Sequence, residues 1–122
     1  MDCIFCKIVK NEIPSYTIYE NEHVKCFLDI NPLGDGHTVI IPKHHYKDLK
    51  DIPEEELYEI VKASKYVYNL LDSKLNPLGI RIVQNNGCYQ EIKHYHMHLI
   101  PKYNNNELTD IEEVYNKIKG TN

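Results

Sequence analysis

The stretch HYHMHLI, residues 94–100, alternates three histidines with apolar or aromatic side chains in this chain of 122 residues. Successive side chains of a β-strand point to opposite faces of a sheet, so residues two apart share one face. The pattern predicts a strand that ends at Pro101, with the three imidazoles about 7 Å apart along one face. The other face, which we expect to pack into the core, carries Tyr95, Met97 and Leu99.

Three imidazoles in a row have three physical interpretations. They could form a polar sheet face, a tri-histidine site for a hydrolytic zinc ion, or a site where one imidazole attacks phosphorus. The first is disfavoured, because adjacent imidazoles gain nothing from packing and repel one another when protonated. The stretch alone leaves the other two open.

Outward from this stretch, short β-branched runs alternate with turn-forming residues. Four further strands are predicted at residues 16–19, 24–28, 38–41 and 79–83, with a loop at 29–36 and turns at 20–22 and 85–87. Short helical segments are predicted at residues 4–10 and 110–119. Strands on either side of one long helix indicate an α+β fold with a five-stranded antiparallel sheet, which we expect to form a single domain over residues 1–122.

The long helix is predicted from Pro53 to Leu75. Glutamates at residues 54–56 favour its N-terminus through the helix dipole, and Asp51 is a candidate N-cap. Asn76 and the proline after it end the helix. Apolar residues at helical spacing predict its core-facing side: Leu57, Ile60, Val61, Val67, Leu71 and Leu75.

Composition disfavours two classes of partner. The net charge of −4 and the pI near 5.9 argue against a nucleic-acid-binding surface, which is normally basic. No apolar run reaches the roughly 20 residues that cross a bilayer, and the N-terminus lacks the features of a secretion signal. We therefore expect a cytoplasmic protein with no membrane partner, whose cysteines stay reduced: Cys3, Cys6, Cys26 and Cys88.

The close pair Cys3 and Cys6 indicates either a redox motif or a metal site. A redox pair usually lies at a strand-to-helix junction of a thioredoxin-like βαβ unit, which this N-terminus does not match. A tetrahedral zinc site would need two further ligands. Packing of the two thiols as small hydrophobes is the remaining alternative.

Several short motifs follow one another along the chain. They are CIFCKI at residues 3–8 with EIP at 12–14, FLDINP at 27–32 with GHT at 36–38, IPKHH at 41–45, NNG at 85–87, and the three histidines of residues 94–98. Together they resemble the histidine triad (HIT) superfamily over about residues 3–102. The match is closer to its Hint-like bacterial branch than to the branch that cleaves dinucleoside polyphosphates. The resemblance implies a HIT-like fold and a homodimer.

The resemblance also implies an activity: a nucleotide-binding hydrolase or transferase that cleaves the α-phosphorus bond of purine nucleoside phosphoramidates or other nucleotide conjugates. His96 would attack phosphorus to form a nucleotidyl-histidine intermediate, which water hydrolyses. His98 would hold phosphate oxygens or orient the nucleophile, and His37 would complete the polar cluster. The alternatives are a regulatory nucleotide-binding module with weak turnover and a dinucleoside polyphosphate hydrolase.

Substrate contacts follow from the same resemblance. Asp29 corresponds to a ribose-binding carboxylate, with an Asx turn before Pro32 as the local alternative. The slot for the base corresponds to residues that would otherwise be ordinary core: Phe5, Ile8, Phe27 and Ile30. The phosphate and leaving-group side corresponds to Asn85, Gln90 and Glu91.

Family members with this cysteine pair carry structural zinc. The resemblance places the ligands at Cys3, Cys6, His45 and His94, with His44 as the alternative if the register slips by one residue. A Cys2His2 set fills a tetrahedral zinc site and leaves no open position for catalysis. If His94 binds the zinc ion, the tri-histidine site is excluded, and the other two histidines stay free for chemistry.

The chain departs from the family pattern in the segment from Gly87 to Gln90. This segment is shorter than usual, and Tyr89 stands where a glycine is expected. Glycine permits positive φ and close approach of the backbone to a phosphate, and tyrosine permits neither freely. We therefore expect this loop to follow a different path beside the leaving group. The chain also has no tryptophan and a short C-terminal helix.

Overall fold

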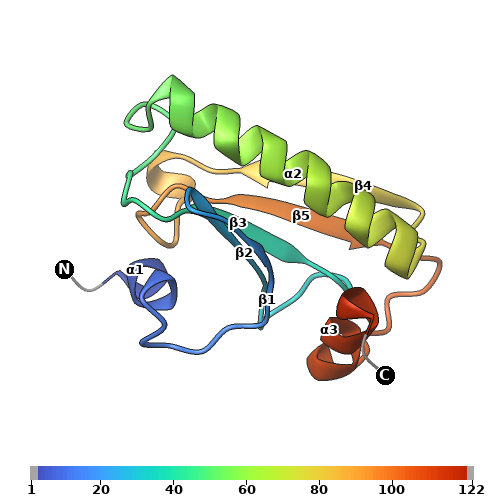
Figure 1. The fold of residues 1–122 in the computed structure, drawn as a ribbon. Helices are drawn as coiled ribbons and strands as arrows, with labels where there is room; N and C mark the ends of the chain where they lie inside the picture. The colour runs from blue at the N-terminus through green and yellow to red at the C-terminus, as the bar shows by residue number, and fades with distance from the viewer. Residues whose placement is uncertain (1–2, 121–122) are drawn as a thin grey trace.

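The computed structural model describes residues 3–120, which form one antiparallel sheet in the order β1-β2-β3-β5-β4 with helices on both faces (Figure 1). The strands are β1 (Thr17–Glu20), β2 (Val24–Leu28), β3 (Thr38–Pro42), β4 (Gly79–Gln84) and β5 (Met97–Lys102). The helices are α1 (Ile4–Val9), α2 (Glu54–Leu75), α3 (Ile111–Lys119) and the short 3-10 helix η1 (Gly87–Tyr89). The predicted α+β class and five-stranded antiparallel sheet are confirmed. None of the described helices combines the length and apolar character that crossing a bilayer requires.

Helix α2 covers one face of the sheet and supplies much of the main core (Figure 1). Its buried side chains are Ile60, Ala63, Ser64, Val67 and Leu71. The prediction that Val61 faces the core is wrong, because its side chain is 50% exposed. Each residue turns the helix by about 100°, so Val61 points away from the face on which its neighbour Ile60 is buried. One turn later, the small side chains of Ala63 and Ser64 let the helix lie close to the sheet.

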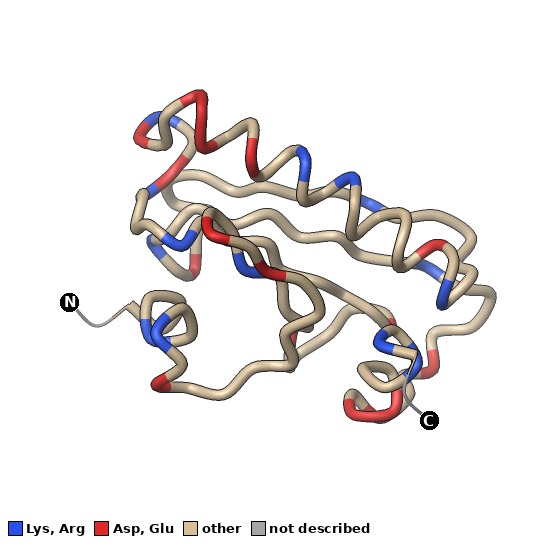
Figure 2. The backbone as a smooth tube through the Cα atoms, in the orientation of Figure 1, with Lys and Arg blue, Asp and Glu red and all other residues tan. Residues whose placement is uncertain are grey.

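Helix α2 begins within one residue of its predicted start, but its N-cap differs from the prediction. Pro53 occupies the N-cap position and makes no side-chain capping bond, so the expected Asp51 cap is wrong. The Asp51 carboxylate instead accepts a hydrogen bond from the Lys47 N–H at 2.8 Å, which closes the preceding loop. Acidic residues gathered at this end of the helix (Figure 2) interact favourably with its dipole in place of a cap. The predicted end is confirmed, because Asn76 adopts the left-handed conformation there.

A second, smaller core lies on the opposite face, beneath α1. Phe5 and Ile8 of α1 pack there against Phe27 and residues of β3. Lys25 is also on this side, 1% exposed, and its ammonium donates to the Ile8 carbonyl and the Asn11 side chain at 2.8 Å each. A cation at the C-terminal end of a helix is favoured by the dipole, so Lys25 ties α1 to the sheet.

Gly34 approaches the end of β5 so closely that a Cβ at this position would overlap the Pro101 carbonyl oxygen. We expect Gly34→Ala to lower the free energy of unfolding by about 2 kcal/mol, because two backbone segments must move apart. Gly79→Ala is the matched control, since a Cβ there meets no atom within 4 Å. Denaturant unfolding measures both variants, and equal losses of stability would contradict the close approach.

Candidate active site and metal centre

Strand β5 begins later than predicted, at Met97, so His94 and His96 precede it. Before this point the backbone leaves β3 and is held by a loop instead: the Tyr95 N–H donates to the Tyr46 carbonyl at 2.6 Å. The alternation nevertheless persists, with Tyr95 and Leu99 buried in the main core. The strand also continues through Pro101, which is opposite Ile80, rather than ending there.

Three imidazoles gather on the face of the sheet opposite α2. The rings of His96 and His98 are 4.9 Å apart, closer than a flat strand would place them. His37, just before β3, joins them through a contact of 3.0 Å between its Nε2 and the Nδ1 of His98. His37 is 3% exposed and His96 is 6% exposed, so the cluster is largely shielded from solvent. The structure thus brings the three predicted catalytic side chains together.

Backbone groups determine which ring nitrogen carries each proton. The Leu33 N–H donates to Nδ1 of His37 at 3.1 Å, so the His37 proton is on Nε2. That Nε2–H donates to Nδ1 of His98, which leaves the His98 proton on its own Nε2. The Nδ1–H of His96 donates to the His94 carbonyl at 2.8 Å. His96 therefore presents an unprotonated Nε2, and His98 presents an N–H donor.

Burial keeps these rings uncharged near neutral pH. It lowers the pKa of His37 and of His96 from the ordinary value, because a charged imidazolium loses its hydration there. Burial lowers the pKa of His98 to about 4, with smaller contributions from the neighbouring histidines. Neutral imidazoles are required for the hydrogen-bond relay above, since a doubly protonated ring has no acceptor.

The free energy of unfolding is expected to fall as the pH drops from about 6.5 to about 4. In this window the unfolded chain protonates His98 while the folded protein keeps it neutral, because its folded pKa is about 4. The unfolded state then binds more protons, so this contribution, about 2 kcal/mol after allowance for solvent screening, is present above the window and lost below it. Denaturant unfolding across the window should show a flatter profile for His98→Gln. Identical profiles for the two proteins would contradict the shift.

Asp29 stands at the edge of the imidazole cluster. Its Oδ2 is 3.6 Å from Nε2 of His37, and its Oδ1 accepts a hydrogen bond from the Asn31 N–H at 2.8 Å. The hydrogen bond from Asn31 forms the Asx turn that the sequence analysis gave as the alternative role of Asp29. The carboxylate therefore closes a turn with one oxygen and faces the cluster with the other.

The apolar residues assigned to the base divide into two sets. Phe5, Ile8 and Phe27 are buried together beneath the imidazoles. The Phe5 ring meets the His96 ring edge-on at 5.0 Å and the Phe27 ring at 5.7 Å. Ile30 is 75% exposed and lies outside this cluster.

The segment 85–91 contains a turn of 3-10 helix, with φ of +63° at Gly87. Gln90 is 6% exposed, and its Nε2 donates to the Lys47 carbonyl at 2.7 Å. Within residues 3–120, its buried Oε1 has no hydrogen-bond partner. Glu91 is exposed, and Asn85 is half-buried. Gln90 therefore braces this loop against the segment after β3.

The four predicted metal ligands meet at one point. The ligand atoms of Cys3, Cys6, His45 and His94 all lie within 4.8 Å of one another. Sγ of Cys6 is 3.2 Å from Nδ1 of His45 and 3.6 Å from Nδ1 of His94, and Sγ of Cys3 is 3.4 Å from Nδ1 of His94. Tetrahedral zinc with ordinary bond lengths separates its ligand atoms by about 3.3–3.8 Å. The spacing fits a metal ion of this kind.

A hydrogen bond outside the four ligands orients His94. Its Nε2 donates to the Pro42 carbonyl at 2.9 Å, which leaves Nδ1 unprotonated and aimed at the two thiols. His44 is exposed and stacks on Tyr46 instead, so the one-residue alternative is not the residue in the cluster.

Sequence reasoning missed the groups that set these orientations. The Leu33 N–H, the Pro42 carbonyl and the His94 carbonyl are backbone atoms, so no side-chain pattern marks them.

The fold and the site define an α+β protein with a buried imidazole cluster beside a group of two thiols and two imidazoles that could hold a metal ion. The model of the HIT domain matches residues 10–105, and the chain belongs to the HIT family. The match begins after the cysteine pair, which the structure nevertheless brings to His45 and His94.

Similar proteins of known sequence and solved structure support this assignment. The chain is 43% identical to an uncharacterized HIT-like protein of Methanocaldococcus jannaschii, over 97% of this chain and 99% of that protein. It is 45% identical to an adenosine 5'-monophosphoramidase of Saccharomyces cerevisiae, over 82% of this chain and 62% of that protein. It is 33% identical to a zinc-bound histidine triad protein of Mycobacterium smegmatis, with a TM-score of 0.89 over 98% of this chain and 92% of that chain.

Proposed function

We propose that this protein hydrolyses purine nucleoside phosphoramidates or similar nucleotide conjugates, with His96 as the nucleophile. The observation that carries the proposal is the hydrogen bond from Nδ1 of His96 to the His94 carbonyl. It frees the Nε2 lone pair in a shielded site and holds the ring in one orientation, which a nucleophile requires. The adenosine phosphoramidase activity named for the yeast relative supports the same class of reaction.

The proposed reaction has two steps and consumes one water molecule. Nε2 of His96 forms a bond to the α-phosphorus as the bond from phosphorus to the leaving nitrogen breaks. The electron pair of that bond departs with the amine, which takes a proton from water. The hydroxide that remains then bonds to phosphorus, the bond to Nε2 breaks, and nucleoside monophosphate is released. The Nε2–H of His98 donates to a phosphate oxygen in both steps.

The nucleotide would lie between α1 and the imidazoles. Phe5, Ile8 and Phe27 offer the base an apolar surface, with Ile30 at its exposed rim. Asp29 is placed to accept hydrogen bonds from ribose hydroxyls, and its Asx turn holds the carboxylate in position. His37 keeps His98 in its donor tautomer, and the segment that carries Asn85, Gln90 and Glu91 borders the leaving-group side.

We also propose that the metal is zinc with a structural role. Two thiolates and two imidazoles are a preferred zinc set, and the four ligands leave no open position for substrate. The zinc-bound Mycobacterium smegmatis protein supports this choice. Zinc would join α1, the segment after β3 and the residues before β5, and so hold the base slot against the imidazoles.

A homodimer is the proposed assembly of this single domain, residues 1–122. Strand β4 is at the edge of the sheet, where a second copy can add its own strand. Exposed apolar side chains beside this edge, Leu78 at 66% and Ile82 at 51%, support the same surface. Sedimentation at several protein concentrations tests the assembly.

A cytoplasmic location stays a prediction. It agrees with the free cysteines, because zinc binding requires reduced thiols.

One assay tests the proposed function against its alternatives. Purified protein is incubated with adenosine phosphoramidate and, separately, with a diadenosine polyphosphate, and release of adenosine monophosphate is measured. Turnover of the phosphoramidate supports the proposal, and turnover of the polyphosphate alone supports the hydrolase alternative. Tight binding of adenosine monophosphate without turnover of either would replace the enzyme with a binding module.

A further inference from the structure

The loop between β2 and β3, residues 29–36, sets the state of the imidazole cluster through one backbone group. The Leu33 N–H selects the protonated nitrogen of His37, and His37 in turn selects that of His98. Strand pairing does not place this N–H, because the ladders of β3 with β2 and β5 begin at Thr38, after the loop. A contact outside the ladders must therefore hold Leu33 against the His37 ring.

Burial of apolar side chains does not hold this loop. Its isoleucine and its leucine, Ile30 and Leu33, are both largely exposed. The hydrophobic effect favours a fixed position only for side chains that leave water, so it contributes little here. The His37 N–H donates to the Gly34 carbonyl at 3.0 Å, which closes a turn within the loop. Hydrogen bonds to another part of the chain are needed to fix where that turn lies.

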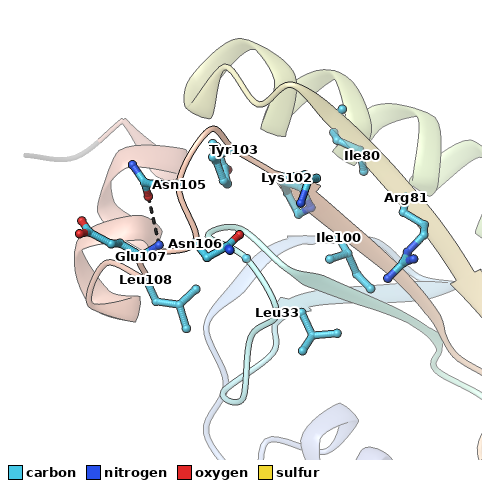
Figure 3. Close-up of a pocket in the computed structure, with 13 residues that line it drawn as sticks. Leu33, Ile80, Arg81, Ile100, Lys102, Tyr103, Asn105, Asn106, Glu107 and Leu108 are labelled. Atoms are coloured by element: carbon cyan, nitrogen blue, oxygen red, sulfur yellow. Dashed lines mark hydrogen bonds between the residues drawn. The ribbon is translucent and has the colours of Figure 1, made fainter.

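The segment after β5 makes such hydrogen bonds at Asp35. The Tyr103 hydroxyl donates to the Asp35 carbonyl at 2.7 Å, and the Thr109 N–H donates to the Asp35 carboxylate at 2.9 Å. The segment has a turn of its own, in which the Glu107 N–H donates to the Asn105 side chain at 3.0 Å (Figure 3). The loop and this segment border the same hollow (Figure 3). Asp35 is thus held through both its backbone and its side chain.

Tyr103 links this loop to the strand that carries His98. It directly follows Lys102, the last residue of β5, and His98 belongs to the same strand. A hydrogen bond from Tyr103 therefore fixes the loop relative to the His98 ring. Burial raises the pKa of Tyr103 to about 12, so the hydroxyl keeps its proton and remains a donor at neutral pH.

We propose that Tyr103 is a positioning residue for the imidazole relay. Its hydroxyl fixes the turn from Leu33 to His37 and so keeps the Leu33 N–H on Nδ1 of His37. The inference rests on the proposed function, in which His98 donates an N–H to the phosphate. Without the hydroxyl, the Leu33 N–H moves away, and His37 can carry its proton on either nitrogen. His98 can then carry its own proton on Nδ1, and it loses its donor toward the phosphate.

Tyr103→Phe removes the hydroxyl and keeps the ring. With adenosine phosphoramidate as the substrate, we expect kcat to fall about fivefold, as the loss of one hydrogen bond of ordinary strength would give. KM should stay within about twofold, because no contact with the bound substrate is removed. Tyr66→Phe is the matched control and should change neither value. Tyr66 lies on α2, across the sheet from the imidazoles, and its ring contacts Tyr19.

Two further measurements distinguish positioning from a general effect on the fold. In the His37→Gln background, Tyr103→Phe should cause no further loss of kcat, because the hydroxyl acts through the His37 ring. Nitrogen-15 NMR of the histidine rings at neutral pH should show the His37 proton on Nε2 in the wild type. In Tyr103→Phe the proton should be shared between the two nitrogens. The spectrum of His37→Gln identifies the His37 signals.

The outcomes separate this inference from the proposed function. An equal loss of kcat with and without the His37 ring would overturn the positioning role, and so would an unchanged His37 tautomer in Tyr103→Phe. Either result leaves the hydrolase intact. If no phosphoramidate is turned over, the proposed function fails, and the NMR comparison still decides the role of Tyr103 because it needs no substrate.

Discussion

His96→Ala is expected to lower the rate of nucleoside monophosphate release by about four orders of magnitude. The variant removes the Nε2 lone pair that forms the covalent intermediate, and no neighbouring group replaces it: Nδ1 of His98 is occupied by the proton of His37. Single-turnover kinetics with adenosine phosphoramidate measure the loss. Acid quenching of the wild type should also trap nucleotide on the protein, and the variant should trap none.

His44→Ala is the matched control for this prediction. His44 is exposed, stacks on Tyr46 and is absent from both clusters, so its removal should leave the rate within about twofold. Equal rates for His96→Ala and the wild type would refute the nucleophile. Thermal unfolding of both variants shows whether a lost rate reflects a lost fold.

Cys6→Ser is expected to abolish stoichiometric zinc and to lower the melting temperature by about 10 °C. Sγ of Cys6 lies next to the ligand atoms of both His45 and His94, so the variant removes the thiol that would share the metal ion with both imidazoles. Without the metal, α1 would be held to the residues before β5 by packing contacts alone, such as the ring contacts of Phe5 with His94 and His96. Elemental analysis of protein purified without chelator measures the metal, and calorimetry measures the melting temperature.

Cys88→Ser is the control for the zinc prediction, because this thiol is exposed and lies outside the metal cluster. It should retain about one zinc per chain and the wild-type melting temperature. A wild-type protein with no bound zinc, or a Cys6→Ser variant that keeps it, would contradict the structural metal. Chelator added to the wild type should reproduce the effect of Cys6→Ser.

Local patterns in the sequence predicted the elements of the fold well. Period-two alternation and β-branched runs predicted every strand to within a few residues, because side-chain alternation is a property of the extended backbone itself. The long helix and its end at Asn76 follow likewise from helical spacing and a residue that tolerates positive φ. Its beginning was predicted to within one residue, but its N-cap was not, because the Asp51 carboxylate accepts a hydrogen bond from the Lys47 N–H in the preceding loop.

The order of the motifs also predicted which residues would meet, although Cys3 and His94 are 91 positions apart. The resemblance carried this information, since no local pattern links two such distant residues. The metal cluster and the group of His37, His96 and His98 have the composition that the sequence indicated. The predicted continuous strand was wrong at its first residues, where contacts with the segment after β3 determine the backbone path.

The sequence by itself determined the class of fold and indicated the side chains that we propose as reactive. Only the tertiary structure decided the state of each imidazole, because the Leu33 N–H and the carbonyls of Pro42 and His94 select the protonated nitrogens. It likewise decided that Val83 lies opposite His98, through the register of β4 against β5. Backbone donors and strand register have no side-chain signature, so they arise only when distant segments pack together.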